Sequence, residues 1–189
     1  PQYKANRSAA PELVKMALDP LQEILKAFNI AVVMVNGFEA DDVIGSMAKQ
    51  WESSEHNIFM VTPDKDYGQL VSDHVFQYKP AKGGNDFEII GKEQICSHYG
   101  ICSPEQVIDI LTIWGDSSDN VPGVRGIGEI GAKKLMEKYG NIENILKHLD
   151  ELPARQKEGF EEFKEQLSMS RFLVTIKTDI PLPSKLEEI

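Results

Sequence analysis

The first half of the chain alternates short, continuously apolar stretches with a longer segment of helical spacing. The apolar stretches are residues 30–35, 57–62 and 74–78, each rich in β-branched or aromatic residues. Short runs of this kind, bounded by turn residues, predict strands that are buried on both faces. Residues 39–51 between the first two have helical spacing. The alternation predicts an α/β fold with a mostly parallel central sheet and flanking helices.

The segment before the first predicted strand is expected to be helical after a polar start. Residues 1–8 show no period, and a helical pattern begins at Pro11. Asp19 and Pro20 interrupt it, because Asp19 can cap a second helix with Pro20 at its first position. That second helix would carry Leu21, Ile24, Leu25 and Phe28 on one face.

The second half of the chain is predicted to be helical. A loop rich in Gly and Lys at residues 80–86 marks the boundary and is followed by a short segment at 87–90. Helices are expected at residues 92–99, 104–114, 129–139, 142–149 and 153–176, the last in two pieces. Pro181 and Pro183 then begin a linker. The predicted division is therefore a sheet domain over residues 1–86, a helical region over 87–180 and a linker over 181–189.

Three groups of acidic residues carry the candidate chemistry, and each has an alternative structural explanation. Acids favour the first turn of a helix, which accounts for the first group. The second group fits a turn with Asx-type hydrogen bonds, and the third fits a solvated loop. The groups are Glu39, Asp41 and Asp42; then Asp64 and Asp66; then Asp116 and Asp119.

Taken together, the three groups predict a metal site. The first two follow successive predicted strands, and ligand sites of open parallel sheets lie outside the carboxyl ends of the strands. If the second group stays extended, Asp64 and Asp66 point to the same side. Clustered carboxylates repel unless a cation lies among them, and oxygen ligands without His or Cys select Mg²⁺ or Mn²⁺. Two such ions about 4 Å apart can hydrolyse a phosphodiester.

A glycine-rich segment after the third acidic group predicts contacts with a nucleic-acid backbone. Gly123, Gly126 and Gly128 lead into a helix that carries Lys133 and Lys134 in its first turns, with Arg125 between the glycines. Open backbone N–H groups at a helix N-terminus bind phosphate without reading sequence. A Gly-x-Gly alone also fits a tight turn between helices. The lysines favour a helix–hairpin–helix over about residues 113–146.

Charge and composition are compatible with a protein that binds a nucleic-acid backbone. The net charge of −10 argues against nucleic acid when taken alone. The charge is unevenly distributed, however, with seven acids and two bases between residues 39 and 66 and four bases against two acids between residues 121 and 140. Cys96 and Cys102 have no zinc-ligand spacing and predict reduced thiols in a cytoplasmic protein. No apolar run approaches the ~20 residues that span a membrane.

The sequence resembles the 5′-nuclease (flap endonuclease) family. The segments YKANR, FEADDVIGSMA, VTPDKDYGQLVSD and GDSSDNVPGVRGIGEIGAKKL occur in the order and at the spacing of that family. The likeness is greatest to the bacterial 5′→3′ exonuclease region that precedes a polymerase domain in the DNA polymerase I family. It implies a PIN-like nuclease core, a helix–three-turn–helix DNA-binding region, two Mg²⁺ or Mn²⁺ ions, and DNA with a 5′ flap, a nick or an RNA primer.

The resemblance also implies roles for individual residues. The acids of all three groups match the metal ligands of the family. Lys4 and Arg7 match basic residues of a helical gateway that contacts the scissile phosphate, and Gly126 and Gly128 match a hairpin that often holds K⁺. The family has two further aspartates, which would lie upstream of Pro1. We therefore expect an incomplete nuclease core and impaired catalysis by this chain alone.

Two other functions remain open at this level. A non-catalytic DNA-binding module could keep the acidic residues as a relic, although a relic has no reason to keep a repulsive cluster. An aspartate-rich ribonuclease with the same type of sheet is disfavoured by the helical region after residue 87.

Overall fold

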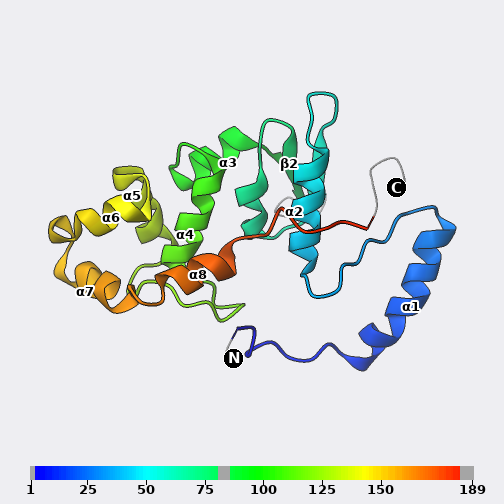
Figure 1. Ribbon diagram of the computed structural model, residues 1–189, viewed down its shortest axis with the longest axis horizontal. Coiled ribbons are helices and arrows are strands. Elements are labelled where there is room, and N and C mark those ends of the chain that lie inside the picture. The colour runs from blue at the N-terminus through cyan, green and yellow to red at the C-terminus, as the bar shows by residue number, and fades with distance from the viewer. Residues whose placement is uncertain (1–2, 81–85, 184–189) are drawn as a thin grey trace.

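The computed structural model describes residues 3–80 and 86–183, in which a small sheet with its helices is followed by a helical region (Figure 1). The strands are β1 (Ile58–Val61), β2 (Val75–Pro80) and β3 (Phe87–Ile90), in the order β1-β2-β3. β1 pairs with β2 in parallel, whereas β3 pairs with β2 in antiparallel orientation. The sheet is therefore mixed rather than mostly parallel, because the short segment at 87–90 turns back and joins it.

The strand predicted at residues 30–35 is wrong. The segment is irregular and exposed, with Ile30 at 52% and Met34 at 68% of full exposure. A continuous apolar run predicts burial on both faces, but burial requires covering layers, and no described strand pairs with the free edge of β1. The first acidic group consequently does not follow a strand of this sheet.

The predicted pair of N-terminal helices is a single helix, α1 (Glu12–Ala27), with Pro20 inside it. Pro20 lacks the N–H that would bond to the preceding turn, yet the helix continues past it. None of the residues of α1 is buried. In Figure 1 this helix stands apart from the rest of the molecule, joined to it by extended segments.

The remaining helices agree well with the sequence. They are α2 (Ala40–Trp51), the 3-10 helix η1 (Lys65–Leu70), α3 (Lys92–Tyr99), η2 (Pro104–Gln106), α4 (Val107–Trp114), α5 (Glu129–Tyr139), α6 (Ile142–Lys147), η3 (Leu149–Glu151), α7 (Ala154–Phe163) and α8 (Leu167–Val174). α4 is the centre of the helical region, since Val107, Ile110, Leu111 and Ile113 are fully buried. It packs against both α5 and α8.

The loop between α4 and α5 doubles back onto the end of α4. A Cβ on Gly123 would lie 2.4 Å from the carbonyl carbon of Trp114, and one on Gly115 would lie 2.6 Å from the Gly123 nitrogen. The Val124 N–H donates to the Ile113 carbonyl at 2.7 Å. Only glycines allow this approach of two backbones. The turn separates the third acidic group, on one side, from the predicted hairpin on the other.

Three further predictions concern the whole chain. Cys96 and Cys102 are both free thiols. None of the described helices combines the length and apolarity needed to cross a bilayer. The predicted loop at 80–86 and linker at 181–189 fall largely outside the described residues.

Candidate functional site

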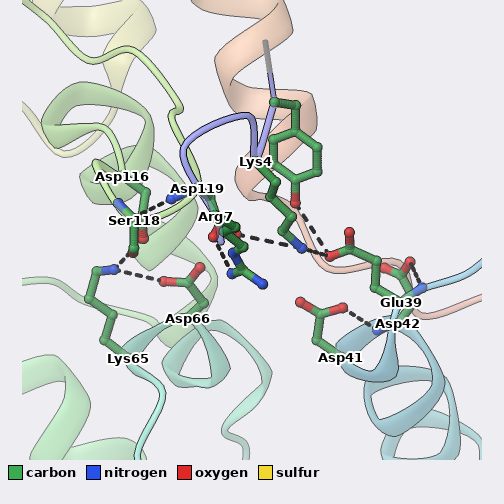
Figure 2. A network of polar contacts seen from close by, with 11 residues as sticks. Lys4, Arg7, Glu39, Asp41, Asp42, Lys65, Asp66, Asp116, Ser118 and Asp119 are labelled. Atoms are coloured by element: carbon green, nitrogen blue, oxygen red, sulfur yellow. Dashed lines mark hydrogen bonds and ion pairs between the residues drawn. The ribbon is translucent and has the colours of Figure 1, made fainter. Parts of the chain in front are cut away.

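Carboxylates from all three acidic groups line one cavity of about 550 Å³. The cavity lies between the N-terminus of α2, the start of η1, the loop after α4, and residues 172–179, which comprise the end of α8 and the segment after it. We call residues 174–180 the strap and the cavity the acidic pocket. Figure 2 shows the carboxylates facing one another across it. The acids of the three groups that line it are Glu39, Asp41, Asp42, Asp66 and Asp119, and Asp179 of the strap lines it as well.

The first group forms the N-terminus of α2. Glu39 is the N-cap residue, and its N–H donates to Asp42 Oδ2 at 3.3 Å. Asp41 Oδ1 accepts the Asp42 N–H at 2.9 Å. Burial raises the pKa of Asp41, and the neighbouring carboxylates add to this rise. The preference of acids for a first helical turn therefore explains the local structure. The same three residues also face one pocket, which that preference does not explain.

The second group separates into two environments, because Asp64 and Asp66 open a 3-10 helix instead of remaining extended. Asp64 is exposed, and its Oδ1 accepts the Asp66 N–H at 3.0 Å. The turn explanation accounts for Asp64. Asp66 lines the pocket, and its buried Oδ1 makes no hydrogen bond of good geometry but lies 3.4 Å from Lys65 Nζ. Burial raises the pKa of Asp66 to about 6.

The third group is tied to basic side chains. Asp116 Oδ2 accepts from Lys65 Nζ at 2.5 Å, and Asp116 Oδ1 accepts the Ser118 N–H at 2.8 Å. Burial raises the pKa of Asp116, but the hydrogen bonds from Lys65 and Ser118 outweigh it and hold that pKa at about 2. Asp119 accepts a hydrogen bond from Arg7 and lines the pocket.

The N-terminal segment brings two cations to the pocket. Residues 3–6 form a turn. The gateway role that the resemblance implies for Lys4 and Arg7 stays a prediction. The Lys4 N–H donates to the Asp119 carbonyl at 2.9 Å, which fixes the turn on the loop after α4. Lys4 Nζ pairs with Glu39 and lies 3.6 Å from Asp119 Oδ2. Tyr3, which sequence reasoning missed, donates from its hydroxyl to Glu39 at 3.3 Å.

The residues of the pocket fit a divalent cation chemically. Its donors are carboxylate oxygens, which Mg²⁺ and Mn²⁺ prefer, and the buried Asp66 Oδ1 lacks a hydrogen bond. Within residues 3–80 and 86–183, no three His, Cys, Asp or Glu side chains converge tightly enough to hold an ion in this arrangement. Lys4, Arg7 and Lys65 lie between the carboxylates instead and offset their repulsion.

The hairpin before α5 exposes its backbone. Gly126 has φ of +79°, and Gly128 is the N-cap residue of α5 with no atom within 4 Å of a Cβ placed there. The side chain of Arg125 is 81% exposed. Lys134 is also exposed, whereas Lys133 pairs with Glu129 at 2.7 Å. The hairpin is open to a large ligand, and one of its two lysines is already paired.

The strap is the part of the site that the sequence did not predict. Residues 153–176 were expected to be helical, but α8 ends at Val174 and the chain continues extended across α2. The sequence signal was the pair Gly45 and Ser46 inside α2, since small residues in a helix mark a close approach. A Cβ on Gly45 would lie 2.8 Å from Ile176 Cγ2.

Comparison with known proteins shows which family the two halves of the chain resemble. Residues 1–100 match the family described as 5′-3′ exonuclease, N-terminal resolvase-like domain. The chain belongs to the 5′-3′ exonuclease family. Residues 102–189 match the description 5′-3′ exonuclease, C-terminal SAM fold, so the exonuclease likeness extends through both halves.

Curated relatives agree with this assignment. The chain is 38% identical over 192 residues to DNA polymerase I of Caldicellulosiruptor bescii, covering all of this chain and 22% of that protein. It is 38% identical to DNA polymerase I of Bacillus subtilis, covering 96% and 21%. A 5′-3′ exonuclease of Buchnera aphidicola is 40% identical, with 100% and 66% covered. The chain thus spans about a fifth of the length of the polymerases.

Solved structures share the fold. The 5′-exonuclease of T5, with divalent metal ions (zinc) bound, superposes with a TM-score of 0.71 at 24% identity, covering 94% of this chain and 68% of that one. The catalytic core of Rad2 in complex with a DNA substrate gives a TM-score of 0.59 at 16% identity, covering 90% and 60%. These likenesses confirm a mixed α/β part followed by a helical part.

Proposed function

We propose that this chain is the 5′→3′ exonuclease and flap endonuclease part of a DNA polymerase I polypeptide. It would hydrolyse phosphodiesters in DNA that carries a 5′ flap, a nick or an RNA primer. The observation that carries the proposal is the pairing, in a chain of this family, of a carboxylate-lined pocket with an open backbone hairpin. The names of the relatives support the same reaction class.

We propose that carboxylates of the acidic pocket hold the divalent ions. A divalent ion held there would supply Lewis-acid activation of water and would offset the charge that develops on the phosphate. Asp42 and Asp64 accept backbone N–H groups and hold the local backbone in place. Lys4 and Arg7 pair with Glu39 and Asp119, which line the pocket, and these two cations would contact the scissile phosphate. The proposed ligands are Glu39, Asp41, Asp66 and Asp119, which line the pocket, together with Asp116, which shares Lys65 with Asp66.

The hairpin would hold the duplex through its backbone. The N-cap residue of α5 is Gly128, which has no side chain to cap the helix, so among the described residues the N-terminus lacks a side-chain cap and its first N–H groups can donate to phosphate. Gly128 leaves room for the DNA backbone, and Lys134 adds a positive charge on the same helix. Such contacts carry no sequence information, which suits an enzyme that selects structure.

The hairpin fits K⁺ poorly. The guanidinium of Arg155 lies against Gly126, with its Nε 3.1 Å from the position of a Cβ there. A monovalent cation beside Gly126 would share the hairpin with this fixed positive charge. We therefore expect duplex binding to be the same in potassium and in tetramethylammonium salts at equal ionic strength.

The test is cleavage of a 5′-labelled flap duplex with Mg²⁺ or Mn²⁺, compared between the parent chain and Asp66→Asn. The proposal expects products from the flap junction in the parent and at least a hundredfold less in the variant, with duplex binding in Ca²⁺ unchanged. Equal products from both proteins would contradict the metal assignment. Duplex binding without any cleavage would instead favour the non-catalytic DNA-binding module.

The chain by itself is expected to cut slowly. In the described residues the acids are paired with lysine and arginine instead of converging on an ion. Phosphoryl transfer depends on positioning, so an unassembled ligand set lowers turnover. A rate equal to that of a whole DNA polymerase I under the same conditions would contradict this expectation.

A further inference from the structure

The strap is fastened to the body of the molecule by polar contacts rather than by pairing with the sheet. It leaves α8 at Val174, crosses α2 and forms one wall of the acidic pocket. Two of its own side chains, Ile176 and Ile180, are buried, so it is anchored along its length. In Figure 1 it runs as an extended segment past α2 toward the C-terminus.

Gln69 makes the first fastening. It is 7% exposed and lies on η1, three residues after Asp66. Its Nε2 donates to the Asp66 carbonyl and to the Val174 carbonyl, both at 3.0 Å. Its Oε1 accepts the Ile176 N–H at 3.0 Å. Both amide hydrogens and the amide oxygen are therefore used, and they connect the backbone of Asp66 directly to the strap.

Ser46 of α2 makes the second fastening. Its hydroxyl donates to the Lys177 carbonyl at 3.2 Å and accepts the Ile180 N–H at 3.2 Å. Ser46 is 2% exposed. With Gly45 beside it, the surface of α2 is smooth enough for the strap backbone to lie directly on the helix.

The strap in turn holds a carboxylate of the pocket. The Lys177 N–H donates to Asp42 Oδ1 at 2.9 Å, while Asp42 Oδ2 accepts the Glu39 N–H. A continuous path of hydrogen bonds thus leads from the backbone of Asp66 through Gln69 and the strap to Asp42. Asp66 and Asp42 belong to different elements, and this path links the two sides of the pocket.

We propose that Gln69 is a positioning residue of the nuclease site, acting through the strap to fix the acids at the start of α2 relative to Asp66. The role rests on the proposed function, because it concerns the carboxylates that would bind the divalent ions. Gln69 does not touch the pocket's contents. Loss of its amide donors removes the hydrogen bonds to the Asp66 and Val174 carbonyls. The strap is then held near Asp42 only by the Ile176 N–H and by Ser46.

The principal variant is Gln69→Glu, which keeps the size of the side chain but replaces the donating amide with a carboxylate that faces two carbonyls. The matched control is Gln106→Glu. Gln106 also spans three backbone groups, accepting from Cys102 and Ser103 and donating to Gly140, and it lies outside the acidic pocket. Both variants are expected to lose folding stability, so stability alone does not distinguish them.

Three measurements on the whole chain distinguish a positioning role from a structural one. Amide hydrogen exchange over residues 174–180 should be at least tenfold faster in Gln69→Glu and unchanged in Gln106→Glu. The Mn²⁺ dissociation constant, measured by calorimetry, should rise at least tenfold in Gln69→Glu alone. On a flap substrate, kcat should fall with KM unchanged, because the hairpin that binds the duplex is intact.

Ser46→Ala serves as a second variant if Gln69→Glu does not fold. It removes the other fastening without touching Asp66, and it should change exchange and Mn²⁺ affinity in the same direction. Rapid strap exchange with unchanged Mn²⁺ affinity would overturn the positioning role and leave the proposed function intact. Absence of Mn²⁺ binding in the parent would overturn both the positioning role and the proposed function. Normal duplex affinity in every variant would show that the loss of activity does not come from a damaged hairpin.

Discussion

Replacing Lys65 with Met should destabilise the metal-free protein and strengthen its binding of metal. Lys65 Nζ lies 2.5 Å from Asp116 Oδ2 and 3.4 Å from Asp66 Oδ1. Its ammonium also lies 5.3 Å from the centre of the Trp114 ring. Met is unbranched and one atom shorter than Lys, and it removes the positive charge that these contacts give to both carboxylates.

The magnitude follows from the pKa of Asp116. Folding lowers that pKa from 3.8 to about 2, and each unit is worth about 1.4 kcal/mol. Ser118 shares the effect, so the part due to Lys65 is about 1–2 kcal/mol at pH 7. Because the folded pKa is the lower one, this stabilisation is present above about pH 4 and is lost as the pH falls toward 2. The difference between parent and variant should shrink over the same interval.

The effect on metal has the opposite sign. Without the ammonium, Asp66 and Asp116 repel each other, and a divalent cation relieves that repulsion. If Mn²⁺ binds tenfold more tightly to Lys65→Met, saturating metal adds about 1.4 kcal/mol more stability to the variant than to the parent. Metal should therefore restore most of the stability that the substitution removes.

Urea unfolding with and without Mn²⁺ measures both effects. The control is Lys133→Met, since Lys133 also pairs with a carboxylate, Glu129, and lies 4.9 Å from the centre of a ring, that of Tyr99, away from the acidic pocket. This control should lose less than about 1 kcal/mol and show no change in its response to metal. An equal response to Mn²⁺ in the parent and in Lys65→Met would refute the reasoning.

Three other predictions concern the loop and hairpin. Gly128→Val should fold normally, since nothing lies within 4 Å of the new Cβ, but should weaken duplex binding in fluorescence anisotropy. Lys134→Ala should reduce the log–log salt slope of duplex binding by about 0.9, and Lys133→Ala should reduce it less because Lys133 is paired with Glu129. Gly123→Ala should lower the unfolding free energy by about 3 kcal/mol or more, because its Cβ would meet the backbone of Trp114 at 2.4 Å; a smaller loss in urea unfolding would contradict that contact.

The sequence predicted best those features that local physics determines. The helices from Lys92 onward and strands β1 and β2 follow from apolar periodicity and turn residues, and they were predicted within a few residues. Members of all three acidic groups line one pocket, but Asp64 and Asp116 do not, and the metal site itself stays a prediction. One premise was wrong, because residues 30–35 are not a strand. Periodicity shows that a segment is apolar, but it does not show which layer, if any, covers it.

The rest of the site depends on contacts between residues far apart in the chain. The bond from Lys177 to Asp42 and the fastening of the strap by Gln69 join residues more than a hundred positions apart, and nothing in local spacing encodes them. The pairing of Lys65 with Asp116 is of the same kind. The sequence shows which acidic and basic residues are present, but only the fold determines which of them form ion pairs.

The free edge of β1 has a consequence for the behaviour of the chain in solution. Phe59 is 47% and Val61 is 72% exposed on this strand, and no described strand covers its outer hydrogen-bonding groups. An uncovered apolar edge of this kind is a template for self-association between copies. The net charge of −10 keeps copies apart at low ionic strength, and added salt screens that repulsion. Colloidal stability should therefore fall along the same salt series that weakens DNA binding, so light scattering needs to accompany every titration.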